Sequence, residues 1–480
     1  MASILITLTL AASPSMPSFH IEQFGCRATQ ADAAAIERQL RERGCSVADA
    51  SSSADFVIVN TCTVTAAADA QARDAIRAIR RRNPAAQIIV TGCYAQRAPE
   101  ELAALPGVGW VVGNSHKAEI PRLIGEDSRS AAGFLPLEAL AAEPFSLSRG
   151  PAKILTGDIF EETAVLVAPV LGGEAGHTRP VLKIQDGCNS RCAYCVIPFV
   201  RGRSRSLPPE SVLGEIRKLT AAGFREIVLS GINLGAYGRD LSPRVEFTTL
   251  LQRILDETTL ERLRISSIEP LDVTEEFIAI FASSERIARH FHIPLQSGSD
   301  RVLAAMHRWY RAEHYARHAE LIRERLPHAG IGADVIAGFP GETEDDHAAT
   351  LALIRRLPFS YLHVFSYSER PGTAAATLAG KVPPTVIQRR ARELRALGEE
   401  KAAAFRRAQI GRTLRVLTLH SREGDAPGWS PALSGNFLRV RIGGVLSHNQ
   451  WCRVRITEVA GNFLLGQIAP PPLPAVAGEQ

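Results

Sequence analysis

The sequence contains no apolar stretch of about 18 residues, the length that a helix needs to cross a bilayer, which excludes an integral membrane protein. Cysteine is also scarce, since eight in 480 residues are too few for a disulfide-stabilised scaffold. Neither sign of charge dominates: 55 Lys and Arg against 50 Asp and Glu give a net charge of +5, which permits an anionic partner without requiring one. With 45% hydrophobic and 22% charged residues, the chain is expected to form about three globular domains.

The cysteines that are present form two groups of three, and odd-numbered groups indicate metal sites rather than disulfide pairs. One group lies close together: Cys188, Cys192 and Cys195. The other is spread over the N-terminal part of the chain: Cys26, Cys62 and Cys93. Thiolate metal sites belong in a reducing compartment, so we expect a cytoplasmic protein. No motif surrounds Cys45 or Cys452, and we expect both to be ordinary structural residues.

The first residues resemble the apolar part of a secretion signal, SILITLTLAA at residues 3–12. No Lys or Arg precedes this stretch, as an export signal would require. Met16 opens a more ordinary beginning, MPSFHIEQFGC. We therefore favour a sequence that is extended before its true start at Met16 over an export signal, although the sequence does not decide between Met1 and Met16 as the start of translation.

Short apolar runs alternate with helical stretches from His20 to about residue 113, which predicts a parallel sheet covered by helices. Three of the predicted strands, in IEQFGC, FVIVNTC and QIIVTGC, end in a cysteine. Open α/β sheets bind ligands at the carboxyl ends of their strands, so these cysteines are expected at a ligand-binding edge. We assign residues 18–127 to this N-terminal domain.

The pattern changes twice along the rest of the chain. Small and turn-forming residues dominate 128–173, which predicts a linker or covering loops. Six strand–helix units over 174–405 predict a partial (β/α) barrel whose site lies at the strand ends. Short β runs separated by Gly and Asn over 408–470 predict a small antiparallel β-barrel. The expected fold class is therefore α/β, with a parallel-sheet domain, a partial barrel and a small C-terminal barrel.

The strongest chemical signal is CNSRCAYC at residues 188–195, directly after a predicted strand. Three thiolates on one loop can bind three irons of a [4Fe–4S] cluster and leave the fourth iron free to bind a small molecule. A structural zinc ion is the alternative, but such a site needs four ligands and this loop supplies three.

This CxxxCxxC spacing, with Tyr194 before its last cysteine, resembles the signature of radical S-adenosylmethionine (SAM) enzymes. The resemblance implies that SAM binds the free iron of the catalytic cluster and is cleaved by one electron to methionine and a 5′-deoxyadenosyl radical. Three later segments support it: LSGIN at 229–233, HIPLQSGS at 292–299 and GADVIAGFPGE at 332–342. The implied SAM contacts are Tyr194, Ser230, Gly231, Asn233, Gln296, Ser297, Asp334, Gly338, Pro340 and Gly341. The last two glycines are equally well interpreted as turn residues.

The N-terminal cysteines narrow the resemblance further. Their surroundings, in particular NTCTVT at 60–65 and TGCYAQ at 91–96, resemble the N-terminal domain of methylthiotransferases. The resemblance covers residues 18–405 and implies that Cys26, Cys62 and Cys93 hold a second [4Fe–4S] cluster, with a free iron for the sulfur that is transferred. Three buried structural cysteines are the alternative.

Within this family, NTCTVTAAAD, VVGNSHK and SGINLGAYGRDL are most similar to the branch that modifies N6-threonylcarbamoyladenosine in tRNA. Thr29 departs from the family pattern, which commonly has Asn there, and this puts one local contact in doubt. The resemblance implies methylthiolation of adenine carbon 2 at position 37, beside the anticodon, with two SAM molecules. A radical is needed because acid–base catalysis does not activate this C–H bond.

The implied partners are tRNA, SAM and an electron donor such as flavodoxin or ferredoxin, whereas the sulfur donor is not determined. Two other substrates stay open, isopentenyladenosine in tRNA and a ribosomal-protein aspartate. A non-catalytic RNA-binding protein with structural zinc sites is the alternative from another class.

Basic residues indicate where RNA could bind. RGRSRS at 201–206 follows the cysteine loop directly and is expected to contact phosphates. A second basic group lies on one predicted helix and is more simply a solvated face: Arg77, Arg80, Arg81 and Arg82. The C-terminal barrel resembles a TRAM domain, in which Phe437 and Trp451 would stack on bases, although a plain structural barrel fits equally well. Its alternating basic residues are Arg439, Arg441, Arg453 and Arg455.

Overall fold

The computed structural model describes residues 16–124, 152–163, 165–166, 168–169, 178–421 and 425–470. Most of the predicted linker and the segment before Met16 lie outside these residues. The contacts divide the chain into two compact units. The first contains residues 35–62, 68–157 and those before Cys26, and the second contains 26–34, 63–67 and the chain from Asp158 onward. Among the helices described, none combines the length and apolar character needed to cross a membrane.

The first unit is built on a six-stranded parallel sheet in the order β2-β1-β3-β4-β5-β6. Its strands are β1 (Ser18–Gln23), β2 (Ser46–Val47), β3 (Phe56–Thr61), β4 (Gln87–Gly92), β5 (Val108–Val112) and β6 (Lys153–Leu155). The helices along this part of the chain are α1 (Arg27–Glu42), α2 (Ala66–Arg82), α3 (Cys93–Arg97), α4 (Pro99–Ala103) and the 3-10 turn η1 (Asn114–Glu119). The predicted parallel α/β architecture is thus confirmed.

The sheet is buried on both faces, as its continuous apolar strands require. Val57 and Val59 of β3 belong to one hydrophobic cluster, whereas Ile58 belongs to the cluster on the opposite face. One element was not expected: β6 lies inside the segment 128–173 that we predicted as a linker, and it pairs with β5. Three residues carry too little periodicity to be recognised as a strand, and only pairing with β5 defines it.

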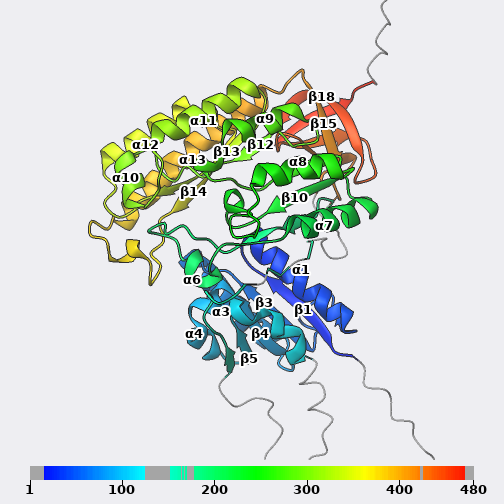
Figure 1. Ribbon diagram of the computed structural model, residues 1–480, viewed down its shortest axis with the longest axis vertical. Helices are drawn as coiled ribbons and strands as arrows, with labels where there is room; N and C mark the ends of the chain where they lie inside the picture. The colour runs from blue at the N-terminus through cyan, green and yellow to red at the C-terminus, as the bar shows by residue number, and fades with distance from the viewer. Residues whose placement is uncertain are drawn as a thin grey trace, which may run out of the picture. The chain divides into compact units, whose positions relative to one another are not determined.

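The second unit contains six parallel strands in two hydrogen-bonded groups, β11-β10-β7 and β12-β13-β14 (Figure 1). An isolated bridge between Leu263 and Ile287 joins the groups. The strands are β7 (Val181–Lys183), β10 (Glu226–Ser230), β11 (Arg262–Ile265), β12 (His290–His292), β13 (Gly330–Ala337) and β14 (Tyr361–Ser366). Their helices are α7 (Pro209–Ala221), α8 (Phe247–Glu257), α9 (Glu275–Ser283), α10 (Asp300–Ala305), α11 (Ala312–Arg325), α12 (Glu344–Arg356) and α13 (Pro384–Arg407). All six strands fall in the runs predicted from the sequence.

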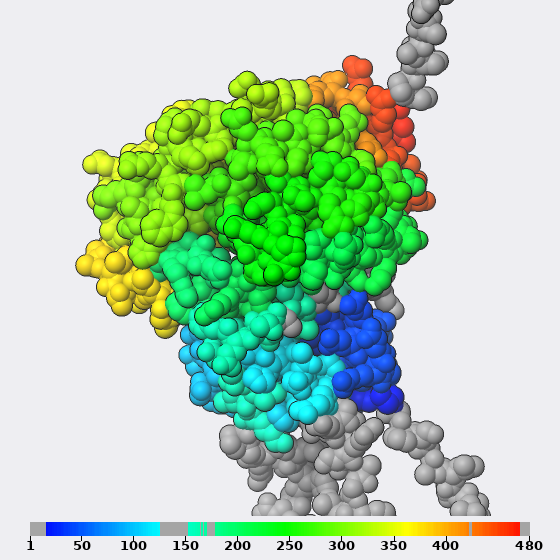
Figure 2. All heavy atoms as spheres, in the orientation of Figure 1, coloured from blue at the N-terminus to red at the C-terminus, as the bar shows by residue number. Residues whose placement is uncertain are grey.

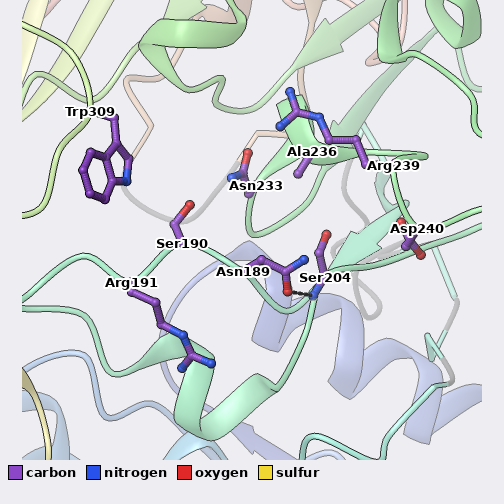
Figure 3. A pocket seen from close by; sticks show the side chains of 9 residues that line it. All are labelled: Asn189, Ser190, Arg191, Ser204, Asn233, Ala236, Arg239, Asp240 and Trp309. Atoms are coloured by element: carbon purple, nitrogen blue, oxygen red, sulfur yellow. Dashed lines mark hydrogen bonds between the residues drawn. The ribbon is translucent and has the colours of Figure 1, made fainter.

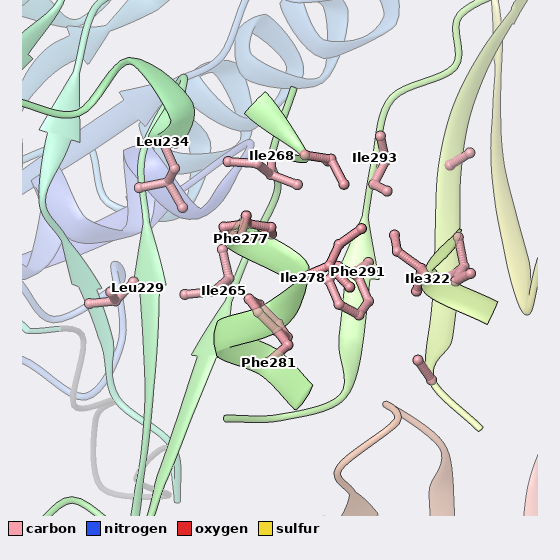
Figure 4. Packing of buried hydrophobic residues seen from close by; sticks show 14 of the residues in the cluster. Leu229, Leu234, Ile265, Ile268, Phe277, Ile278, Phe281, Phe291, Ile293 and Ile322 are labelled. Carbon is pink, nitrogen blue, oxygen red and sulfur yellow. The ribbon is translucent and has the colours of Figure 1, made fainter. Parts of the chain in front are cut away.

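The helices pack on the outer face of these strands and form the main hydrophobic core. Phe277 and Phe281 of α9 point toward Ile265 of β11 and Phe291 of β12 (Figure 4). The Phe281 and Phe291 ring centroids are 4.4 Å apart, and burying one such side chain contributes roughly 1.5–3 kcal/mol to stability. In the space-filling view, the atoms coloured green to yellow come from this part of the chain (Figure 2).

The inner face of the same strands is polar. Because neighbouring residues of a strand point to opposite faces, Leu182, Leu229 and Leu263 face the helices while their neighbours face inward. Those inward positions carry Lys183, Glu226, Arg262, Arg264, His290, His292, Asp334, Tyr361 and His363. A polar inner wall is what a barrel needs to bind a polar ligand rather than to fill itself with side chains.

The C-terminal strands form a closed barrel in the order β15-β16-β17-β19-β18. They are β15 (Thr413–Thr418), β16 (Trp429–Ser434), β17 (Arg439–Gly443), β18 (Trp451–Ala460) and β19 (Phe463–Ile468). The predicted small barrel is confirmed, with two additions. β16 was not recognised in the sequence, and β17 pairs with β19 in parallel, whereas the other pairs are antiparallel.

The two aromatic residues that were expected to stack on RNA bases instead contact other side chains of the protein. The ring of Phe437 stacks on His290 at a centroid distance of 4.4 Å. Trp451 lies between the guanidinium groups of Arg262 and Arg415, which are 4.2 and 4.1 Å from its ring centroid. These contacts join the small barrel to the strands of the core, so the structure assigns both rings to docking. Arg439, Arg453 and Arg455 remain exposed.

Candidate functional site

The loop that carries Cys188, Cys192 and Cys195 is held at its base by a short antiparallel ladder, β8 (Gln185–Asp186) with β9 (Arg205–Ser206). The Cys188 amide donates a 3.0 Å hydrogen bond to the Gly202 carbonyl. Gly187 has φ 70°, and a Cβ there would lie 1.9 Å from the Arg203 carbonyl oxygen. Only glycine permits this approach, so the chain direction into Cys188 is fixed by backbone geometry.

Four buried charges lie directly beneath this loop. Arg201 donates to Asp186 at 2.9 and 3.0 Å and to Asp32 of α1 at 2.9 Å, and Lys183 donates to Asp186 at 2.8 Å and also to Asp32. Burial alone would raise the pKa of Asp186, but Arg201 and Lys183 hold it well below its usual range. Two cations and two anions therefore compensate one another, which makes their burial tolerable.

This network corrects one expectation from the sequence. Arg201 and Arg205 of the RGRSRS segment are buried, and Arg205 donates to the backbone carbonyls of Arg201 and Arg203. Only Arg203 of the three is exposed. Arg201 neutralises buried carboxylates and Arg205 closes a turn, so these two side chains are not available to contact phosphates.

Gln185 connects the cysteine loop to the next strand end. Its side-chain NH2 donates to the carbonyls of Asp186 and Gly187 at 3.0 and 2.8 Å, and its side-chain oxygen accepts from the Asn233 amide at 2.8 Å. Gly231 lies against the same side chain, because a Cβ there would be 3.0 Å from that oxygen. The segment 230–233 is therefore fixed relative to Cys188.

The three thiols are free and half-buried. Ser190 NH donates to the Cys188 sulfur at 3.4 Å, and Arg308 donates to the Cys192 sulfur at 3.4 Å. Burial raises the pKa of the Cys195 thiol to about 12 and also raises that of Cys192. Such thiols stay protonated on their own and ionise only when a metal replaces the proton.

A single metal ion does not fit these thiols. In the described part of the chain, one group of three His, Cys, Asp or Glu residues brings its ligand atoms within 4.8 Å of one another, and it consists of His292, Asp334 and His363. The three cysteine sulfurs are spaced more widely, which suits a cluster in which each sulfur binds a separate iron. The donor set therefore fits a [4Fe–4S] cluster better than a zinc ion.

The residues expected to contact SAM lie along the carboxyl ends of the strands. Ser230 ends β10, and Asn233 follows it with its side-chain NH2 4.0 Å from the Cys188 sulfur. The Asn233 side-chain oxygen is buried and has no hydrogen-bond partner within the described residues, as expected of a group that awaits a ligand. Tyr194 is half-buried beside a cluster that includes Met306 and Phe339.

Of the SAM-binding residues predicted later in the sequence, some are accessible to solvent and others are buried. Asp334 of β13 lies 3.1 Å from His292 and 3.2 Å from His363, and it is 24% exposed. Gln296 takes a left-handed φ of 64°, and its amide donates to the Asp334 carbonyl. Ser297 is fully buried, and its hydroxyl lies 3.3 Å from that of Thr350.

The GFPGE turn has a structural reason for its glycines. Gly338 and Gly341 take φ values of 81° and 82°, on either side of the buried Pro340. A Cβ on Gly338 would lie 2.3 Å from Ile387 of α13. Both glycines are thus required by the backbone, which does not exclude a contact between the turn and a ligand.

In the first unit, Cys62 and Cys93 follow neighbouring strands whose ends pair through Thr61 and Gly92. Gly92 has φ 100°, and a Cβ there would lie 2.3 Å from the Thr61 carbonyl oxygen. This close approach brings the two strand ends together, and both thiols are buried.

Cys26 is exposed and directly precedes α1 in the second unit. The hydroxyl of Thr29, the residue that departs from the family pattern, donates a 2.7 Å hydrogen bond to the Cys26 carbonyl. The substitution therefore keeps a polar contact in the first turn of α1.

A pocket of about 400 Å³ lies beside the cysteine loop. Figure 3 shows Trp309 at one end and Arg239 with Asp240 at the other, with Asn189, Ser190 and Arg191 between them. Trp309 is 80% exposed, which is unusual for so large an apolar ring. No sequence motif pointed to Trp309, because exposure depends on the fold.

The chain matches two family models: "Uncharacterized protein family UPF0004" over residues 18–113 and "Radical SAM superfamily" over residues 182–354. The threonylcarbamoyladenosine tRNA methylthiotransferase MtaB of Aquifex aeolicus is 38% identical over 83% of this chain and 92% of its own length. The corresponding Bacillus subtilis protein is 36% identical over 88% of this chain and 89% of its own length. This chain belongs to the radical SAM methylthiotransferase family.

The methylthiotransferase is therefore a tRNA-modifying enzyme that uses SAM and [4Fe–4S] clusters, as expected, and the alternative of a non-catalytic RNA-binding protein with zinc sites is excluded. A relative from another branch, the tRNA-2-methylthio-N(6)-dimethylallyladenosine synthase of Sphingopyxis alaskensis, is 34% identical over 97% of this chain and 100% of its own length. The fold is similar to that of the radical SAM methyltransferase TsrM of Kitasatospora setae, with a TM-score of 0.54 and 18% identity over 75% of this chain and 77% of that chain.

We predict that Cys192→Ala removes the ability of the methylthiotransferase to cleave SAM, because the loop then offers two thiolates where the cluster needs three. Iron content measured after anaerobic purification should fall by up to about four atoms per chain. Cys452→Ala is the matched control, since Cys452 packs against the small-barrel core and should leave iron and SAM cleavage unchanged. Undiminished SAM cleavage by Cys192→Ala would contradict the assignment.

Proposed function

We propose that the enzyme installs a methylthio group on carbon 2 of N6-threonylcarbamoyladenosine at position 37 of tRNA, using two SAM molecules per product. The observation that carries this proposal is the similarity, over most of both chains, to two relatives named for that nucleoside. The dimethylallyladenosine branch remains the second candidate because one of its members matches this chain along nearly its whole length.

The position of three free thiols on one loop supports the first of the two proposed ligand sets. Cys188, Cys192 and Cys195 would hold the cluster that binds SAM, next to the unpartnered Asn233 oxygen. The second cluster would be held by Cys26, Cys62 and Cys93. When bound, SAM and its cluster supply a radical able to break an aromatic C–H bond. The protein's own residues fix the loop and orient the ligand, and a small flavodoxin or ferredoxin would supply the electron.

The pocket beside the cysteine loop is suited to the anticodon loop of tRNA. Unpaired bases stack on aromatic rings, and Trp309 offers an open ring. Arg191 and Arg239 line the same pocket and bring positive charge to a phosphate. We infer that Trp309 stacks on a loop nucleotide next to the modified one, and that Arg191 and Arg239 bind its backbone.

Mass spectrometry of tRNA nucleosides from a deletion strain tests the proposed substrate. Loss of 2-methylthio-N6-threonylcarbamoyladenosine with accumulation of its unthiolated parent is expected. Loss of the 2-methylthio form of isopentenyladenosine instead would place the enzyme in the other tRNA branch. Unchanged tRNA nucleosides together with loss of a modified ribosomal-protein aspartate would refute a tRNA substrate.

Cys62→Ala should separate the two proposed clusters by function. Because Cys62 lies outside the loop that holds SAM, the variant should still cleave SAM to 5′-deoxyadenosine. It should form no methylthiolated nucleoside, since the second cluster would be lost and the transferred sulfur would have no iron to bind. Chromatography of both products from one anaerobic reaction measures this, and methylthiolated tRNA made by the variant would overturn the role of Cys62.

Trp309→Ala should weaken tRNA binding by about tenfold, because stacking of a base on an aromatic side chain contributes about 1–3 kcal/mol. Filter binding at fixed salt provides the dissociation constant, and SAM cleavage without tRNA should stay at the wild-type level. Ile410→Ala, another exposed apolar residue but outside the pocket, serves as the control. Equal affinities for the Trp309 variant and wild type would exclude stacking.

A further inference from the structure

On the inner face of the six parallel strands, the side chains at the amino ends of the strands carry an excess of positive charge. Glu226 of β10 is completely buried, and its carboxylate accepts from Arg264 at 2.8 Å and from Arg179 and Arg262 at 3.4 Å. Burial would raise the pKa of Glu226, but these three arginines lower it to about 2. One carboxylate thus faces three guanidinium groups.

Two of the three arginines have all the partners that they need. Arg264 donates to the carbonyls of Ser434 and Gly435, and Arg262 donates to the carbonyl of Arg415. These carbonyls belong to the C-terminal barrel. Arg262 and Arg264 therefore hold the C-terminal barrel against the strands, and backbone carbonyls as well as Glu226 compensate their positive charge.

The third of these arginines, Arg179, and a fourth one nearby, Arg27, are not satisfied in this way. Arg179 has only the long contact to Glu226, and 23% of its side chain is accessible. Arg27 begins α1 and lies within electrostatic reach of Glu226 as well as of Arg179, Arg264 and Tyr361. Its guanidinium makes no hydrogen bond or ion pair within the described residues.

The remaining groups on this wall add no negative charge near the arginines. Tyr361 shares its hydroxyl with His290 and His292 at 2.9 Å each, and burial keeps the pKa of His290 well below its usual value. Beyond His292, the next carboxylate in this hydrogen-bond network is that of Asp334, which is paired with both His292 and His363. Four arginines against Glu226 leave a buried positive excess, which is costly unless an anion binds.

The position of these arginines excludes the carboxylate of SAM as that anion. Glu226, Arg262, His290 and Tyr361 are each the first residue of a strand, whereas the cysteine loop and Asn233 lie at the opposite ends. The five residues of β10 separate the two ends by about 13 Å, at roughly 3.3 Å per residue. An adenine held with carbon 2 near the cysteine loop would direct an extended N6 substituent toward the arginines.

We propose that Arg27 and Arg179 bind the carboxylate of the N6-threonylcarbamoyl group and thereby select this nucleoside over one with an apolar substituent. This inference rests on the proposed function. Guanidinium groups suit a planar carboxylate because they donate two parallel hydrogen bonds. An isopentenyl group would leave Arg27 without a hydrogen-bond partner and Arg179 with only its long contact to Glu226, so the same residues that attract one substrate disfavour the other.

The test compares three anticodon stem-loop RNAs that differ only at position 37: threonylcarbamoyladenosine, its carboxamide analogue and unmodified adenosine. The wild-type enzyme should convert the carboxylate form with a kcat/KM at least about tenfold above that of the carboxamide, as expected for a charge-assisted hydrogen bond. Arg179→Gln and Arg27→Gln should lose that preference, and Arg179→Lys should restore part of it. Arg217→Gln, an exposed arginine on α7, should keep the full preference.

Iron content and SAM cleavage without RNA show whether each variant is intact. Because Arg27 adjoins Cys26, Arg179→Gln carries the decisive comparison. Preference for the carboxylate that survives in Arg179→Gln would overturn the inference, as would equal rates for carboxylate and carboxamide with the wild type, and the proposed function would stand in both cases. If the wild-type enzyme converts none of the three RNAs but converts a fourth stem-loop that carries isopentenyladenosine, the proposed function itself is refuted.

Discussion

The site depends on the four buried charges of Asp32, Lys183, Asp186 and Arg201. They link the first half of α1, β7, the base of the cysteine loop and α6 (Ile197–Arg201) within one unit. Their charges cancel, but removing one partner from such a buried set typically costs about 3–5 kcal/mol because an uncompensated charge is left behind. The loop that offers three thiolates is thus held by an interaction that tolerates little change.

The division of the strands into an apolar outer face and a polar inner face explains how one layer serves both stability and chemistry. The outer residues, such as Ile265 and Phe291, pack on the helices and contribute most of the hydrophobic burial. The inner residues carry charge that the fold only partly neutralises. Three free thiols lie at one end of the strands. At the other end, the guanidinium groups outnumber the carboxylates. Each end of the strands therefore offers a group of side chains that is suited to bind a charged ligand.

Much of the fold could be predicted because it follows from local patterns. The six strand–helix units predicted over residues 174–405 correspond to β7 and β10–β14 with their helices, because apolar runs alternate there with helical periodicity. The cysteine loop was recognisable because ligand spacing is written in consecutive residues. β6 and β16 were missed because short strands acquire their identity from the partners they pair with, which the local sequence does not show.

The sequence alone determined the order of most strands and helices, the three-thiol motif and the family, since each depends on residues near one another along the chain. The tertiary structure decided which charges are buried. It placed Arg201 against carboxylates rather than at the surface, turned Trp451 and Phe437 toward the protein and left Trp309 open. Burial and pairing depend on residues that lie far apart in the sequence and meet only after folding, so no local pattern encodes them.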